Sequence, residues 1–210
     1  MLGVGCSLFV LIAPLRSSAP MNPVRRPHSG SDHDGILAER GRPVMVVRRH
    51  PENGAPVPGY LTWGLIPRDA DTRPDIQPMN ARAETIADKP MFRDAYRKRR
   101  GIVPIDAFHQ KDAKGKLHTI KRADDEPLAI AAIWENWKNP DTGQWERTFA
   151  TITVPANADV DSVHDRMPLV LEKKDLERWL GPEEDPRDLL KPSADDVLQV
   201  VAMGKRPRRR

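Results

Sequence analysis

The chain has 210 residues, of which 39% are hydrophobic and 30% are charged, and it carries a formal net charge of +4 with an isoelectric point of about 9.3. This length fits one globular domain, and the 21 prolines and the mean hydropathy of -0.60 indicate long polar connections. No stretch reaches the ~20 consecutive apolar residues that a membrane helix needs, which argues against a membrane protein.

The first forty residues differ in composition from the rest of the chain. Residues 7–13 form a short apolar run that resembles the core of a secretion signal, but no basic residue precedes it and no clear cleavage site follows. Residues 14–40 are rich in Pro, Ser, Gly, Arg and His and show little hydrophobic periodicity. We therefore expect residues 1–40 to be a poorly ordered or atypical segment.

Cys6 is the single cysteine of the chain. A single cysteine excludes an intrachain disulfide framework and a cysteine-based zinc site. The histidines also lack the spacing of metal ligands, so no metal is expected. This cysteine usage fits a reducing compartment, and we expect a cytoplasmic protein.

From residue 41 the sequence indicates strands and turns with single helices between them. The expected strands are bounded by Gly, Pro, Asp or Asn and comprise residues 44–47, 60–66, 102–109, 118–121, 128–134, 148–154 and 167–171. Helices are expected at residues 88–100, with Asp88 as the N-cap, and at residues 173–180. The predicted class is α+β, with an antiparallel or mixed, barrel-like sheet and a few interspersed helices.

Positive charge is concentrated in two places, Arg97–Arg100 and the tail of residues 205–210. Clusters of this kind occur on surfaces that contact phosphate groups. Because Arg97–Arg100 falls on a predicted helix, its side chains would point in different directions, which favours a solvated helix end. We place the folded domain at residues 41–204 and treat residues 205–210 as a basic tail.

Three short motifs follow one another with a specific order and spacing. They are Trp-Gly-Leu-Ile-Pro at 63–67, Asn-Ala-Arg-Ala-Glu-Thr at 80–85 and His-Asp-Arg-Met-Pro at 164–168. Together with Trp134-Glu135 and Pro155-Ala156-Asn157, these motifs resemble the SOS response-associated peptidase (SRAP) family, whose bacterial members process abasic sites. The resemblance runs from about Gly41 to about Gly204 and implies a SRAP-type α+β fold.

The resemblance also implies a specific chemistry, which serves the response to DNA damage. Members of the family bind single-stranded DNA and capture the aldehyde of an abasic site with a cysteine at the start of the mature chain. The α-amine forms an imine and the thiol closes a thiazolidine ring, so one residue supplies both nucleophiles. The same amine supports self-cleavage of a leader peptide and DNA lyase-type chemistry. We expect a monomer without cofactor that associates with the nucleoid at sites of damage.

Five residues match the family's site positions. Asn80 matches the asparagine that orients the amine or the abasic sugar, and His164 matches the histidine that moves protons. Arg82 and Arg166 match arginines that clamp phosphates, and Trp63 matches a residue of the DNA-binding face, where a ring can stack on a base. From the residues alone, the favoured interpretations are a core position for Trp63, a helix cap for Asn80, and a surface arginine with a buried stem for Arg82.

Two positions depart from the family pattern. The family reads Gly-Phe-Tyr-Glu-Trp where this chain reads Ala107-Phe108-His109-Gln110-Lys111, so the catalytic glutamate is replaced by Gln110. An amide cannot titrate, and general-base catalysis worth ~10²–10⁴-fold would be missing.

The second departure is at the start of the chain. The family begins Met-Cys, whereas here five residues precede Cys6, whose nitrogen as translated is an amide. Cleavage before Cys6, a misassigned start or loss of the crosslinking function are the alternatives. If crosslinking is lost, the protein would act only as a single-stranded DNA-binding module.

Overall fold

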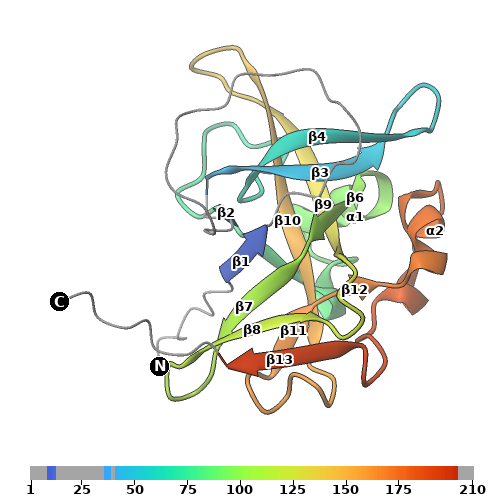
Figure 1. Cartoon of the computed structure of the whole chain (residues 1–210). Coiled ribbons are helices and arrows are strands. Elements are labelled where there is room, and N and C mark those ends of the chain that lie inside the picture. The colour runs from blue at the N-terminus through green and yellow to red at the C-terminus, as the bar shows by residue number, and fades with distance from the viewer. Residues whose placement is uncertain (1–8, 13–35, 39–40, 203–210) are drawn as a thin grey trace, which may run out of the picture.

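A computed structural model describes residues 9–12, 36–38 and 41–202 (Figure 1). Its centre is a mixed sheet in which β10, β4, β3, β6 and β9 pair in that order and β9 pairs again with β10. The ring of five strands is therefore a closed barrel. Its strands are β3 Pro43–Arg49, β4 Pro56–Trp63, β6 Arg100–Ile105, β9 Leu128–Lys138 and β10 Trp145–Pro155.

Three short strands extend this sheet. They are β5 Asn80–Arg82 and β11 Arg166–Pro168, which both pair with β10, and β12 Val170–Leu171, which pairs with β9. The predicted single strand at 167–171 is thus two strands, because the chain passes from one neighbour to the other at Leu169. The predicted loop at 80–85 begins as a strand, because β5 continues the edge of β10 beyond the end of β4.

A second sheet has the strand order β13-β8-β7-β1-β2. Its strands are β1 Phe9–Ile12, β2 Ile36–Ala38, β7 Ala107–Lys111, β8 Leu117–Arg122 and β13 Leu198–Ala202. Within residues 1–40, predicted to be poorly ordered or atypical, β1 and β2 are paired strands; residues 1–8, 13–35 and 39–40 lie outside the described residues. The predicted strand at 102–109 divides at Asp106 into β6 and β7, which belong to different sheets.

Two short α-helices and three 3₁₀ turns complete the described fold. They are α1 Pro90–Lys98, α2 Leu176–Leu180, η1 Ala83–Thr85, η2 Lys173–Asp175 and η3 Arg187–Leu189. Helix α1 has proline in its first turn and buries Phe92, Ala95 and Tyr96. The residue before it is Lys89 and makes no side-chain cap, so the predicted capping by Asp88 is wrong. The expected α+β class with a barrel-like sheet is confirmed.

Alternation along the strands places one set of side chains inside the barrel. Paired residues share a face, and Val46, Leu61, Trp63 and Phe149 on this face are at most 2% exposed. The rings of Trp63 and Phe149 stack with centroids 6.2 Å apart. The interior of the barrel is therefore a packed core.

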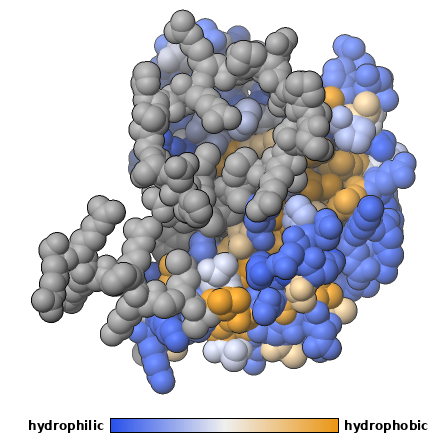
Figure 2. All heavy atoms as spheres, viewed as in Figure 1, coloured by the Kyte–Doolittle hydropathy of each residue, from blue (hydrophilic) through white to orange (hydrophobic). Residues whose placement is uncertain are grey.

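Hydrophilic residues cover the right-hand and lower rims of the face shown in Figure 2, and hydrophobic residues gather towards its middle. In the part of the chain that the structure describes, no helix is long and apolar enough to cross a membrane.

Candidate functional site

Two of the three motifs meet on strand β10. The register pairs Asn80 with Thr151 and Arg82 with Thr153 in parallel, and Arg166 with Pro155 in antiparallel orientation. The second half of β10 therefore pairs both with β5, which carries Asn80 and Arg82, and with β11, which begins at Arg166. Residues that are more than 80 positions apart in the sequence are brought together here.

Asn80 is held in one orientation by its neighbour on β10. The hydroxyl of Thr151 donates a hydrogen bond of 2.6 Å to the side-chain oxygen of Asn80. This bond engages the carbonyl end of the amide and leaves the NH₂ end as the group that can donate to a substrate. The predicted orienting role of Asn80 is compatible with this geometry.

Trp63 lies in the core and is only 2% exposed. Its ring nitrogen donates a 2.8 Å hydrogen bond to the carbonyl of Met79, the residue directly before Asn80. The next residue, Gly64, has a φ of +123°, which side-chain-bearing residues rarely adopt, and its N–H bonds the carbonyl of Phe149. The burial of Trp63 contradicts the predicted stacking on a DNA base; its hydrogen bond instead positions the strand that carries Asn80.

Arg166 is fixed by two neighbours. Its guanidinium makes bonds of 2.7 and 3.0 Å to the two carboxylate oxygens of Glu84. It also donates a 2.7 Å bond to the carbonyl of Thr153. The hydrogen bond from Arg166, and the positive charges of Arg166 and Arg82, lower the pKa of Glu84, so this carboxyl group is ionised at neutral pH.

Arg82 is exposed, and no described carboxylate lies within ion-pair distance of it. It points from the same strand as Asn80, two residues further on, and therefore on the same face. Of the two predicted phosphate-binding arginines, Arg82 has its donors open to solvent, whereas Arg166 already has an acidic partner.

His164 begins the third motif, at the end of the turn that precedes β11. Its Nδ1 lies 3.0 Å from the backbone N–H of Arg166 and 2.9 Å from a carboxylate oxygen of Asp165. The neutral ring can accept the first of these bonds, and the protonated ring can donate to the carboxylate.

Gln110 lies on the other sheet, in β7, and is 3% exposed. Its side-chain oxygen is buried and has no hydrogen-bond partner among the described residues. Strand β1, which begins three residues after Cys6, pairs with β7 so that Phe9 is opposite His109. Cys6 itself lies outside the described residues.

Three residues of this site were missed by the sequence analysis. Thr151 and Thr153 orient Asn80 and Arg166 through their side chains, and Glu84 pairs with Arg166. Glu84 lies within a recognised motif, so its charge was a usable signal. The threonines lie in an ordinary strand pattern, and only the register of β10 shows their role. Within the described ranges no group of three or more His, Cys, Asp or Glu could hold a metal ion.

Comparisons with known proteins agree with this geometry. Residues 36–206 match the family model described as SOS response associated peptidase (SRAP). The chain is 36% identical over 162 residues to the abasic site processing protein YoqW of Bacillus subtilis (strain 168), a match covering 71% of this chain and 72% of that protein. It is 32% identical over 125 residues to the abasic site processing protein YedK of Escherichia coli (strain K12), covering 58% and 54%.

The fold is also similar to solved structures. A protein from Bordetella bronchiseptica superposes with a TM-score of 0.71 at 27% identity, covering 83% of this chain and 90% of that one. A protein from Bacteroides thetaiotaomicron gives the same TM-score at 28% identity, covering 78% and 75%. The matched model spans all three motifs and the strands that position them. The chain belongs to the SOS response associated peptidase (SRAP) family.

Proposed function

We propose that this protein binds single-stranded DNA at abasic sites and captures the ring-opened aldehyde in a covalent adduct. The observation that carries the proposal is the convergence of Asn80, Arg82, His164 and Arg166 on the second half of β10. An oriented amide, a proton-transferring imidazole and two guanidiniums are suited to a sugar aldehyde flanked by phosphates. Relatives named as abasic site processing proteins support this choice of substrate.

The proposed covalent step uses Cys6 as an amino-terminal residue. Its α-amine adds to the aldehyde carbon and loses water to give an imine, and the thiol then adds to the same carbon to close a thiazolidine. His164 would carry the proton that the departing hydroxyl needs. Strand β1, which begins three residues after Cys6, pairs with β7, the strand that carries Gln110.

The test is incubation of the full-length protein with a single-stranded oligonucleotide that carries one abasic site. We expect an adduct that survives heating on a denaturing gel, and an intact mass of the DNA-free protein that begins at Cys6. Cys6→Ala is the matched control and should give no adduct. A full-length mass without adduct would contradict the covalent function.

Arg166→Ala is expected to weaken binding of single-stranded DNA at low salt. The change removes one cation and also leaves the negative charge of Glu84 uncompensated beside Arg82. Each phosphate contact to a single strand contributes about 0.7 to the slope of log affinity against log salt, so the slope should fall by at least about that amount. Fluorescence anisotropy at several salt concentrations measures it.

Arg122→Ala is the control for this measurement, because Arg122 is paired with Asp124 in the turn after β8. Arg82→Ala should lower the slope without loss of stability, since its side chain is exposed. An unchanged affinity in both Arg82→Ala and Arg166→Ala would remove the phosphate-binding role from this site.

A second candidate function is binding of single-stranded DNA without covalent chemistry. The observation that favours it is Gln110, an amide that cannot act as general base where the family has a glutamate. In that case the affinity for single strands would persist and depend on salt, while the denaturing gel would show no adduct.

A further inference from the structure

A cavity of about 880 Å³ lies at the other end of β10 from the candidate site. Its lining is strongly cationic and includes Arg48, Arg49, Arg97, Lys98 and Arg147, with Glu184 as the single acidic residue among those described. None of the residues of the candidate site lines it. Arg147 precedes Thr153 by six residues, which corresponds to roughly 20 Å along an extended strand.

The arginines of this cavity are built into the barrel. The register places Arg48, Gly101 and Ala132 on one face, and Trp134 follows two residues later on that face. The guanidinium of Arg48 lies 5.2 Å from the centre of the Trp134 ring. The same guanidinium also lies next to Gly59. A Cβ added at Gly59 would be 3.2 Å from Nη2 of Arg48. The position of Arg48 therefore depends on an aromatic ring and on the absence of a side chain.

Three arginines that line this cavity lack an anionic partner among the described residues, whereas Arg99, which also lines it, is paired with Glu135. No ion pair joins Arg48, Arg49 or Arg147 to a carboxylate in the described part of the chain, and the buried Nε of Arg48 has no hydrogen-bond partner there. Burial and the nearby charge of Arg147 lower the pKa of Arg48. The buried amide oxygen of Asn136, on the same face, is also without a partner.

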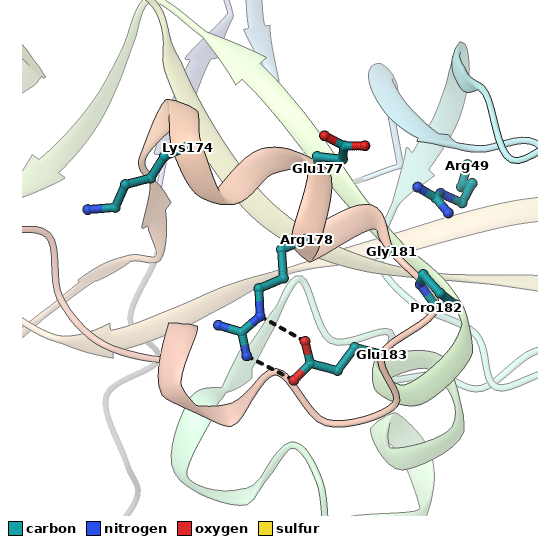
Figure 3. A pocket seen from close by; sticks show the side chains of 7 residues that line it. All are labelled: Arg49, Lys174, Glu177, Arg178, Gly181, Pro182 and Glu183. Atoms are coloured by element: carbon teal, nitrogen blue, oxygen red, sulfur yellow. Dashed lines mark hydrogen bonds and ion pairs between the residues drawn. The ribbon is translucent and has the colours of Figure 1, made fainter.

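The neighbouring cavity of about 690 Å³ shows the opposite arrangement (Figure 3). It shares Arg49, Gly181 and Pro182 with the first cavity. The arginine that lines only this second cavity, Arg178, is paired with Glu183 and Asp188, so its charge is already neutralised. Of the arginines without a carboxylate partner, Arg48 and Arg147 therefore line only the first cavity, and Arg49 lines both.

We propose that the cavity around Arg48 and Arg147 binds the phosphodiester backbone of nucleic acid, as a second contact surface separate from the candidate site. Guanidinium groups without carboxylate partners, held by packing and directed into one concave surface, suit phosphate oxygens. Exposed Trp145 lies two residues before Arg147 on the same face of β10 and can contact an adjacent base. The choice of nucleic acid among polyanions rests on the proposed function.

The test compares the full-length protein with Arg147→Gln and with Arg48→Gln/Arg147→Gln. Lys116→Gln/Lys191→Gln is the matched control, because it removes two positive charges from exposed side chains that line neither cavity. Two undamaged thymidine oligonucleotides are titrated at several salt concentrations, one of about 6 and one of about 30 nucleotides, chosen around the ~4–16 nucleotides that small binding folds occupy.

For the long oligonucleotide we expect the salt slope to fall by about 0.7 in the single variant and by about 1.4 in the double variant, with unchanged slopes in the control. Binding of the short oligonucleotide should be little affected, because it can occupy the candidate site alone. Unchanged slopes in Arg147→Gln, an exposed position whose replacement leaves the core intact, would overturn the inference. So would binding of inorganic phosphate that depends on Arg48 and Arg147 while DNA binding does not.

Adduct formation on an abasic strand is measured with the same variants. Loss of the salt slope in a protein that forms no adduct would support the second contact surface and contradict the covalent function. Adduct formation with unchanged slopes would support the covalent function and contradict the second contact surface. The two proposals can therefore fail separately.

Discussion

Arg100→Ala is expected to lower the free energy of unfolding by about 4 kcal/mol. Arg100 is 5% exposed, and its guanidinium lies between two helix ends. It donates bonds of 2.6 Å to the carbonyl of Trp179, 2.8 Å to that of Tyr96 and 2.7 Å to that of Gly181, and a further one to Glu183. Hydrogen bonds to a charged group are worth ~1.5–3 kcal/mol each, and their loss leaves several carbonyls without donors.

Arg178→Ala is the matched control, since it removes an arginine that has two acidic partners but is 41% exposed. Surface pairs of this kind contribute ~0–1 kcal/mol. Denaturant unfolding of both variants measures the difference. A loss of less than about 1 kcal/mol for Arg100→Ala would show that the carbonyls find water instead. Arg100→Lys should not restore stability, because one ammonium cannot reach carbonyls arranged around a planar fork.

Gln110→Glu is expected to raise the rate of abasic-strand cleavage or of leader removal by ~10²–10⁴-fold, the usual contribution of a positioned general base. The side chain of Gln110 is 3% exposed and its oxygen has no described partner. Burial disfavours the charged form of a carboxyl group, so the new glutamate should have a raised pKa. Such a group can exchange protons closer to neutral pH than an exposed glutamate.

The measurement is the initial rate of strand cleavage and of mass loss from the chain, as a function of pH. With Gln110→Glu the rate should increase with pH as the new carboxyl group loses its proton, and then level off. Gln110→Met is the control, because methionine has a similar size but cannot titrate. Its rates should equal those of the unmodified chain at every pH. No gain in rate, or a gain without pH dependence, would show that the family role does not transfer to position 110.

The secondary structure could be predicted from local patterns wherever a strand stays in one sheet. Residues 44–47 and 148–154 lie within β3 and β10, and both are short runs of β-branched and apolar residues bounded by turn signals. The stretch 167–171 has the same local pattern but divides between two neighbours at Leu169. Which strand a segment pairs with is decided by residues far away in the chain, and a local pattern contains no information about them.

Trp63 illustrates the same limit at the candidate site. A tryptophan beside a glycine is consistent with a core residue or with an exposed stacking platform, and the two differ only in what lies against the ring. Phe149, on β10, and the carbonyl of Met79, directly before β5, contact it in the structure. The cavity around Arg48 and Arg147 could not be predicted for the same reason, since nearly a hundred residues separate them.

The sequence by itself determined the family and the fold class, and it proposed Asn80, Arg82, His164 and Arg166 as site residues, because the motifs are short, local and specific in their spacing. Only the tertiary structure decided which of these side chains face one another, that Trp63 is buried, and where positive charge lacks a partner. Those properties depend on strand register and burial, which are set when distant segments pack together to remove apolar surface from water.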